Sequence, residues 1–371
     1  MILDPTETGN LKIRASFRFI MEWVVNHQRK EARMKYLGLD AHSSTCTLAC
    51  LSNRGKRLGY EKFSTSAKNL ISAVTAIKGK KILAVEESHL AAWVKATVSP
   101  YVDKLVVCDP KHNKWISHDD HADDKVDATK LADLLRGGYL KEIYHPDEKG
   151  ECLRSLFLHY YDLNHQIVRF KCKLKAEFRQ LAIPAKGGGI YNPKKRSEWL
   201  ALLEGKPYVQ LQVNQDYQMI DMLEKMKGIT YTKMVELAKK DKAFSLLCSI
   251  PGVGKVVATG YLALIVTPYR FSRKNKLWRY GGFSNQVQQS DGVTYKDRPT
   301  RTGNRVLKWV VIQQYIQAVL LSSKTNRFRK RYHKMVTHGK SSQTAKRAVC
   351  RDILATVRAV WMKGETYRAL S

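Results

Sequence analysis

The sequence of 371 residues has no uncharged apolar run that reaches the roughly 18 residues a helix needs to cross a membrane. Its most apolar stretches, residues 256–266 and 310–321, are short or contain glutamine and tyrosine. Residues 17–25 form a short, mostly apolar patch, but no small-residue cleavage site follows them, which argues against a secretory signal. We therefore predict no membrane partner.

The sequence also has no pair of cysteines in CxxC spacing, although it contains seven cysteines. An odd number of scattered thiols argues against a disulfide framework. Cys46 and Cys50 have the spacing of one face of a strand, so we expect them to be small buried thiols. This cysteine usage is typical of a reducing compartment, and we predict the cytoplasm.

Acidic residues are scarce: 33 Asp and Glu stand against 65 Lys and Arg, which gives a formal net charge of +32. Residues 270–371 contain 23 of the basic residues and only four acids, so more than half of the net charge lies there. The aromatic residues interleaved with these charges are Trp278, Tyr280, Trp309, Tyr315, Phe328 and Tyr332. Basic charge with interleaved aromatic rings predicts a nucleic-acid surface, and phosphate neutralisation makes such binding salt-dependent.

Four of the carboxylates stand at positions from which their side chains can meet at one point of a folded domain. Asp40 and Glu86 each end a short apolar run, and Asp124 and Asp127 lie three residues apart at the start of a helical pattern. Glu87 is the rival of Glu86, but the two point in opposite directions along a strand. Converging carboxylates repel one another unless a cation lies among them, and Mg²⁺ takes oxygen ligands. The pattern predicts metal-dependent chemistry on nucleic acid.

Residues 35–145 alternate between strand and helix patterns, which indicates a mixed α/β sheet. Strands are expected over residues 36–40, 45–51, 56–63, 82–86 and 105–108, and helices over 67–77, 90–98 and 124–136. We assign the apolar face of the third helix to Val126, Leu131, Leu134 and Leu135.

Residues 150–182 change character, because their apolar residues recur at nearly heptad spacing. We predict a coiled-coil arm that dimerises; the alternative is one amphipathic helix packed on its own domain. The domains expected are an extension over 1–33 that precedes a natural start at Met34, a catalytic domain over 34–148, the helical arm over 149–240, and a mainly helical basic domain over 241–371.

Two segments of the basic domain are candidate phosphate-binding sites. Residues 250–254, Ile-Pro-Gly-Val-Gly, lie between apolar helical stretches and resemble a helix-hairpin-helix grip on a nucleic-acid backbone. Gly252, Gly254 and Lys255 would contact phosphate there; a plain helix–helix turn is the alternative. The second segment places Ser290 in a small polar stretch. The cations and amide just downstream of this serine are Arg298, Arg301, Asn304 and Arg305.

Together these motifs resemble the insertion-sequence transposases that join a RuvC-like DEDD domain to a C-terminal serine-containing domain, the recombinases guided by a bridge or seek RNA. The resemblance covers nearly all of residues 34–332. It rests on Leu37-Gly-Leu-Asp40, Val85-Glu86-Glu87, Asp124-Lys-Val-Asp127-Ala128 with Leu131-Ala132, Ile250-Pro-Gly-Val-Gly254, Tyr280-Gly-Gly282 and Thr302-Gly-Asn304-Arg305.

The resemblance implies a ribonuclease-H-like (RuvC-like) α/β fold whose Asp40, Glu86, Asp124 and Asp127 bind Mg²⁺, or Mn²⁺ in its place. It implies that Ser290 is a nucleophile that becomes covalently joined to a DNA 5′ phosphate. The family shows Ser-Ser-Gly at this point, whereas this chain has Ser-Asp-Gly.

The resemblance also implies partners. These are the DNA of the element ends and of the target, a structured guide RNA that pairs with both, and homodimers that assemble into a tetramer. Arg298, Arg301 and Arg305 would neutralise the scissile phosphate. The setting implied is the cytoplasm of a bacterium or archaeon, in association with the nucleoid.

Two other functions remain open on the sequence. A junction-resolving endonuclease of the RuvC type would use the same carboxylates to hydrolyse DNA with water and would not need Ser290. A non-catalytic nucleic-acid-binding protein would keep its phenotype when the carboxylates are replaced.

Overall fold

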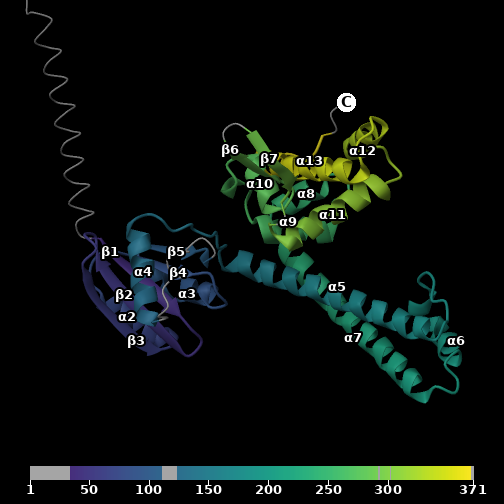
Figure 1. The fold of residues 1–371 in the computed structure, drawn as a ribbon, viewed down its shortest axis with the longest axis horizontal. Coiled ribbons are helices and arrows are strands. Elements are labelled where there is room, and N and C mark those ends of the chain that lie inside the picture. Colours follow the sequence, from purple (N-terminus) through teal and green to yellow (C-terminus); the bar gives the residue numbers. More distant parts are fainter. Residues whose placement is uncertain (1–33, 111–122, 291–292, 301, 369–371) are drawn as a thin grey trace, which may run out of the picture. The chain divides into compact units, whose positions relative to one another are not determined.

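The computed structural model describes residues 34–110, 123–290, 293–300 and 302–368 (Figure 1). Contacts divide the chain after His145 into two compact units. The predicted extension over residues 1–33 lies outside the described residues. Within the part of the chain that is described, no helix is long and apolar enough to cross a membrane.

The first unit is built on a five-stranded mixed sheet. Its strands are β1 (Lys35–Ala41), β2 (Thr45–Ser52), β3 (Arg57–Ser64), β4 (Lys81–Glu86) and β5 (Lys104–Cys108), in the order β3-β2-β1-β4-β5. The first three strands pair antiparallel, and β1, β4 and β5 pair parallel. All five agree with the predicted strands to within a residue or so at each end.

Helices cover both faces of this sheet (Figure 1). The helices α2 (Ala67–Ala76) and α3 (Ala91–Val98) pack on the face that carries the buried side chains of β1 and β4 with odd numbers, such as Leu39 and Val85. The opposite face packs against α4 (Asp124–Arg136), whose Leu131 contacts Ala84. The bounds of α4 match the prediction.

The packing face of α4 differs from the prediction. Ala128, Leu131 and Ala132 are its buried residues, whereas Val126 is 37% exposed. The helix approaches the sheet through small residues because Gly38 has no side chain: a Cβ at Gly38 would lie 2.0 Å from the carbonyl oxygen of Ala128. The assignment of Val126 to the core was therefore wrong.

Replacing Gly38 by alanine should push α4 away from β1. Overpacking of this kind costs about 1–3 kcal/mol of unfolding free energy. Hydrogen exchange of α4 peptides, followed by mass spectrometry in the full chain, should report faster exchange in Gly38→Ala. Gly59→Ala is the control, since no heavy atom lies within 4 Å of its built Cβ. Equal exchange in the two variants would contradict this packing.

The second unit is mainly helical and contains one β-hairpin. Its helices of six or more residues are α5 (Glu148–Gln180), α6 (Arg196–Ala201), α7 (Pro207–Ala238), α8 (Ala243–Cys248), α9 (Lys255–Ile265), α10 (Lys274–Tyr280), α11 (Arg305–Tyr315), α12 (Arg327–Thr337) and α13 (Ser342–Lys363). A five-residue π-helix, η6 (Ile316–Leu320), continues α11. Residues 257–265 of α9 are all buried, and most of its apolar side chains belong to the main core of this unit.

The predicted arm is the pair of long helices α5 and α7, which pack side by side (Figure 1). The heptad face of α5 is covered by α7 of the same chain, where Leu163 and Ile167 contact Leu223. The base of the arm belongs to the main core of the unit, because Phe157 and Met234 are buried in it. This is the intramolecular packing that the sequence left as the alternative.

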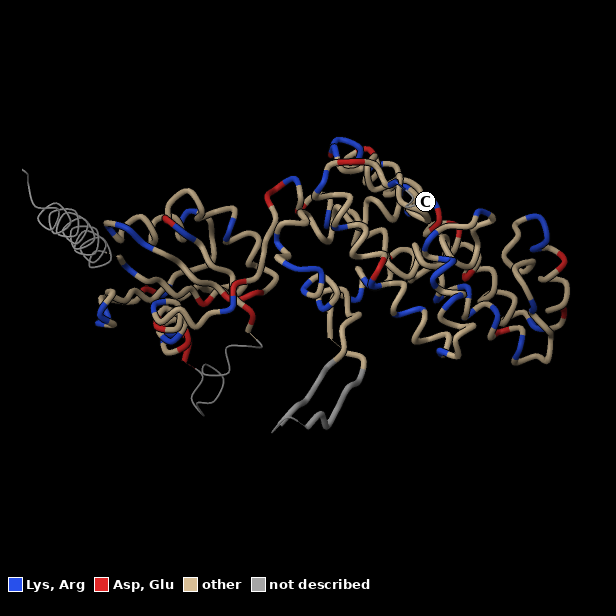
Figure 2. Tube along the Cα trace, turned by 90° about the horizontal axis from the view of Figure 1, so that it is seen from above, with Lys and Arg blue, Asp and Glu red and all other residues tan. Residues whose placement is uncertain are grey.

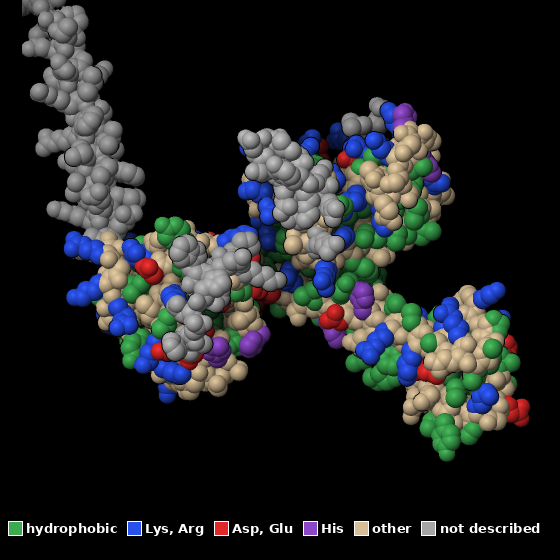
Figure 3. Space-filling view, viewed as in Figure 1, with side chains coloured by type: hydrophobic (Ala, Val, Ile, Leu, Met, Phe, Trp, Pro, Cys, Tyr) green, Lys and Arg blue, Asp and Glu red, His purple; other side chains and the backbone are tan. Residues whose placement is uncertain are grey.

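Dimerisation through the arm stays a prediction. The outer side of α7 exposes apolar side chains, and hydrophobic groups are visible on the surface of the arm in Figure 3. The exposed apolar residues of α7 are Tyr208, Leu211, Met222, Met226 and Ile229.

Candidate active site

Two of the predicted carboxylates stand at the ends of neighbouring parallel strands. Leu39 of β1 pairs with Val85 of β4, so Asp40 and Glu86 follow directly after paired residues. Both carry even numbers, like Gly38 and Ala84, and alternation along a strand places them on the α4 face of the sheet.

The other two carboxylates lie in the first turn of α4. Asp123 caps this helix by accepting a hydrogen bond from the backbone N–H of Lys125 at 3.1 Å, so Asp124 is not the cap. Asp127 follows one turn later on the same side. The positive end of the helix dipole favours negative charge at both positions.

The structure brings Asp40 and Asp124 together with a residue that sequence reasoning missed. One ligand atom each of Asp40, His42 and Asp124 lies within 4.8 Å of the other two. Asp127 is close enough for its charge to raise the pKa of Asp40. Neither Glu86 nor Asp127 belongs to the compact group of three. The signal in the sequence was a histidine two residues after a strand-end aspartate.

A lysine also contacts this group. Nζ of Lys62, on β3, donates a hydrogen bond to Oδ2 of Asp124 at 2.8 Å. This bond is the main reason why the pKa of Asp124 is held below its ordinary value. Nε2 of His42 lies 3.1 Å from Oδ2 of Asp40. An ammonium group therefore occupies one side of the carboxylate group.

Burial is the main cause that raises the pKa of Asp40 above its ordinary value, and the charges of Asp124 and Asp127 add to it. His42 acts in the opposite direction. A cation among these oxygens would relieve the repulsion, and carboxylate oxygens are the ligands that hard divalent ions prefer. The donor set fits a divalent metal ion.

Glu87, the rival of Glu86, is engaged elsewhere in the same unit. Its Oε2 lies 2.5 Å from Nε2 of His145. Its backbone N–H donates to the carbonyl of Cys108. Glu86 is thus the better placed of the two to join Asp40.

Ser290 ends the first strand of the β-hairpin in the second unit. The strands β6 (Asn285–Ser290) and β7 (Val293–Pro299) are antiparallel, and Ser290 pairs with Val293. Arg298 lies on β7, opposite Gln286, whereas Arg301 lies outside the described residues. Ser290 was predicted to lie in a small polar stretch, and the hairpin was not predicted.

At the base of this hairpin, the Tyr280-Gly-Gly282 motif contacts the Thr302-Gly-Asn304-Arg305 motif. The backbone N–H of Asn304 donates to the carbonyl of Tyr280 at 2.7 Å, and the Asn304 side chain caps α11 by accepting from the N–H of Leu307 at 2.8 Å. Gly303, with φ at 125°, lies so close to Gly282 that a Cβ would meet its Cα at 2.7 Å. Asn304 thus has a structural role, and Arg305, the exposed first residue of α11, stands beside it.

Residues 250–254 form the turn between α8 and α9, at the position between two helices that the sequence indicated, and phosphate contact there stays a prediction. Gly252 has a positive φ of 79° and packs on α11 and η6, and Gly254 and Lys255 are exposed at the start of α9. Buried Gln314 stabilises the turn, because its side-chain amide donates a hydrogen bond to the carbonyl of Pro251 at 3.0 Å. An open hollow of about 610 Å³ lies beside it, and its far side is lined by residues that include Ser322, Ser323 and Lys324.

The two glycines of this turn should respond differently to alanine. In Gly252→Ala the Cβ would lie 2.7 Å from both Ala318 Cβ and Gln314 O, at a φ that disfavours side chains, so the turn should be destabilised. In Gly254→Ala nothing lies within 4 Å, so the fold should be kept.

If Gly254 contacts phosphate, its alanine variant should bind nucleic acid about 2- to 5-fold more weakly, the equivalent of about 0.3–1 kcal/mol for a helix terminus. Filter binding at one fixed salt concentration measures this. Unchanged affinity in a folded Gly254→Ala variant would leave residues 250–254 as a plain turn.

The basic charge of the second unit includes the residues of α12 (Lys and Arg are blue in Figure 2). The predicted aromatic partners of this charge are largely part of the core: Tyr315 is 3% and Phe328 1% exposed. Trp278 donates from Nε1 to the carbonyl of Arg351. The prediction that aromatic rings are interleaved with the basic charge on a nucleic-acid surface is wrong for Tyr315 and Phe328, because both rings are buried in the core.

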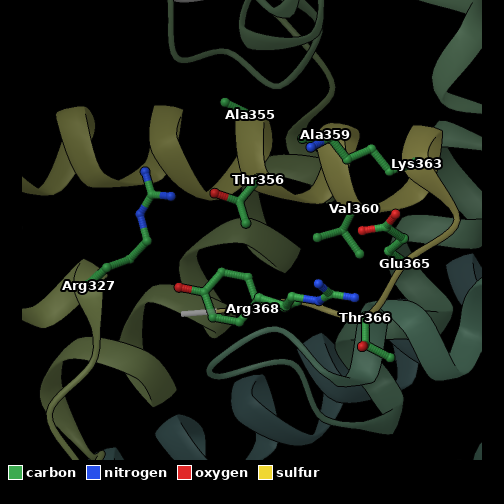
Figure 4. A pocket seen from close by; sticks show the side chains of 10 residues that line it. Arg327, Ala355, Thr356, Ala359, Val360, Lys363, Glu365, Thr366 and Arg368 are labelled. Carbon is green, nitrogen blue, oxygen red and sulfur yellow. The ribbon is translucent and has the colours of Figure 1, made fainter. Parts of the chain in front are cut away.

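A further hollow of about 480 Å³ lies between α13 and the C-terminal segment (Figure 4). Thr356 and Lys363 of α13 line it, with Arg327 and Arg368 opposite. It contains none of the predicted site residues, so we assign it no part in the chemistry.

Two family models match the chain. Residues 37–183 match a transposase model, that of the DEDD transposases of IS110 elements, and residues 244–333 match the transposase IS116/IS110/IS902 family. No curated protein matches the chain. A DEDD transposase domain implies a ribonuclease-H-like α/β fold, in agreement with the mixed sheet, and such domains typically use a divalent metal.

Proposed function

We propose that this chain, which carries the two domains of IS110-family transposases, is an RNA-guided DNA recombinase that excises and inserts an insertion sequence. The presence of both transposase domains indicates a DNA transposase or recombinase. Guidance by RNA, the serine nucleophile and the metal ligands named below are our proposal.

The observation that carries the proposal is the carboxylate group of the first unit. Asp40 and Asp124 come from a strand end and a helix start that are far apart in the sequence, yet their oxygens lie within 4.8 Å. The fold keeps them there although burial and mutual repulsion raise the pKa of Asp40. Burying neighbouring carboxylates together costs folding free energy, and carboxylates with shifted pKa values of this kind are typical of functional sites.

Asp40 and Asp124, with Glu86 and Asp127 beside them, would hold Mg²⁺ or Mn²⁺. When bound, the ion polarises a scissile phosphate and neutralises charge that develops on it. The carboxylates orient the ion and the start of α4 supports their charge. For Asp124 to bind the ion, its hydrogen bond with Lys62 must break. The Lys62 side chain is long and half-exposed, so it can turn into solvent instead.

Ser290 is the proposed nucleophile. Its Oγ attacks the phosphorus of one DNA strand and gives up its proton, the bond from phosphorus to O3′ breaks, and the leaving O3′ takes up a proton. The 5′ phosphate is then held as a phosphoserine ester. A 3′ hydroxyl of another strand attacks this ester and releases the serine, so no external energy source is needed.

A RuvC-type endonuclease is the second candidate, because the same carboxylate group supports attack by water. It would leave free DNA ends and no protein–DNA adduct. Substituting Ser290 would not affect it.

RNA guidance is tested by expressing the protein with the DNA that flanks its gene and sequencing the RNA that co-purifies. The proposal predicts one discrete RNA with segments that match the element ends and a target. Only random cellular RNA in the preparation would contradict guidance.

A further inference from the structure

His42 lies in the short turn between β1 and β2, directly beside the carboxylates. Its Nε2 is 3.1 Å from Oδ2 of Asp40, and it shares the 4.8 Å group with Asp40 and Asp124. Its side chain is 59% exposed, so burial does not explain its position.

The distances suit a shared ion. Ligand atoms of Mg²⁺ or of a transition ion lie about 2.0–2.1 Å from the metal, so two ligands on opposite sides are about 4 Å apart. Three donor atoms within 4.8 Å reach this geometry with small side-chain movements.

The backbone of His42 is held in place. Its N–H donates to the carbonyl of Thr45 at 2.9 Å, and its own carbonyl accepts from the hydroxyl of Thr65 at 2.6 Å. The neighbouring pair Ala41 and Cys46 closes the strand ladder. A ligand on so short and well-anchored a turn loses little freedom when it binds a metal.

We propose that His42 is a nitrogen ligand of the divalent-cation site and shifts its preference from Mg²⁺ toward first-row transition ions. This rests on the proposed metal site of Asp40 and Asp124. Imidazole nitrogen suits transition metals, whereas Mg²⁺ takes oxygen ligands, so an added imidazole strengthens the binding of the former selectively.

The test uses the full chain freed of nucleic acid and loaded with Mn²⁺ or Co²⁺. Pulsed electron paramagnetic resonance of the Mn²⁺ form, with ¹⁵N-labelled histidine, should show coupling to one directly bound nitrogen. His42→Ala and His42→Asn should both lose it. Asparagine keeps a polar group for Asp40, so this variant guards against a local folding defect. His89→Ala, a change at another exposed histidine of this unit, is the matched control.

Titrations of metal affinity give the second readout. His42→Asn should weaken Co²⁺ binding by about 10- to 100-fold or more, since even the loss of a group that only supports a metal ligand costs that much, whereas Mg²⁺ binding should change little. Metal binding that depends on Asp40 but shows no nitrogen coupling, or an equal loss for both ions, would overturn the role of His42 and leave the proposed function intact. A chain that binds no divalent ion at all would overturn both.

Discussion

Asp40→Asn is expected to reduce DNA cleavage and strand exchange by roughly three orders of magnitude or more, the equivalent of several kcal/mol of lost charge stabilisation. Asparagine keeps the shape of the side chain but removes the anionic ligand. Nucleic-acid binding should stay within a few-fold, because the basic surfaces are untouched. Gel assays of cleavage and exchange, beside filter binding, measure both.

Asp40→Asn should not unfold the chain. The pKa of Asp40 is raised in the folded state, chiefly by burial, so the folded chain binds the proton more readily than the unfolded one. The ionised carboxylate therefore costs stability at neutral pH, and the cost disappears below its ordinary pKa of 3.8. In a chelating buffer at pH 7 the variant should melt at the same or a higher temperature, and this gain should vanish in acid.

Asp133→Asn is the matched control on the same helix. Asp133 pairs with Arg136 at 2.7 Å on the exposed side of α4, and such surface pairs contribute little. Its activity should equal that of the unchanged protein. Full activity of Asp40→Asn, or equal losses in both variants, would contradict the carboxylate site.

Ser290→Ala should abolish strand exchange, by three or more orders of magnitude, together with the covalent protein–DNA adduct. The hydroxyl is the proposed attacking group, and alanine leaves no oxygen to attack. The adduct is measured by denaturing electrophoresis of labelled DNA and by mass spectrometry of the modified peptide. Metal binding by the first unit should be unchanged.

Ser284→Ala is the control for this substitution, since Ser284 lies just before β6. It should form the adduct at the normal rate. Exchange at full rate by Ser290→Ala would remove the serine from the mechanism. Cleavage without exchange by this variant would favour the endonuclease.

Periodicity was enough to predict the five strands and the helices that pack on them, although not the order of the strands in the sheet. Alternation and apolar runs set the five strands to within a residue or so, and the bounds of α4 were predicted correctly. Cys46 and Cys50 are buried, as expected. The strand-end positions of Asp40 and Glu86 follow from the same patterns, because a strand of known direction fixes where its last side chain lies.

Other features depend on tertiary packing and were missed. The face of α4 was assigned from large apolar side chains, but the close approach to Gly38 uses Ala128 and Ala132. Lys62 of β3 reaches Asp124 only because β1, β2 and β3 lie side by side, and no sequence spacing contains that information. His42 stands only two residues after Asp40, and that signal in the sequence was overlooked.

The hairpin β6–β7 was predictable and was overlooked. An Asp-Gly pair with Val287 before it, and with Val293 and Tyr295 alternating after it, is a hairpin signal. The heptad of α5 was read correctly as a helix, but a heptad does not say whether its partner comes from the same chain, as α7 does.

The most direct test of the account is to sequence the DNA products of a reaction that contains the purified protein, its co-purified RNA, element-end DNA, target DNA and Mg²⁺. The account predicts joined element–target junctions that disappear with Asp40→Asn and with Ser290→Ala. Free cut ends without junctions, or intact DNA under all conditions, would contradict it.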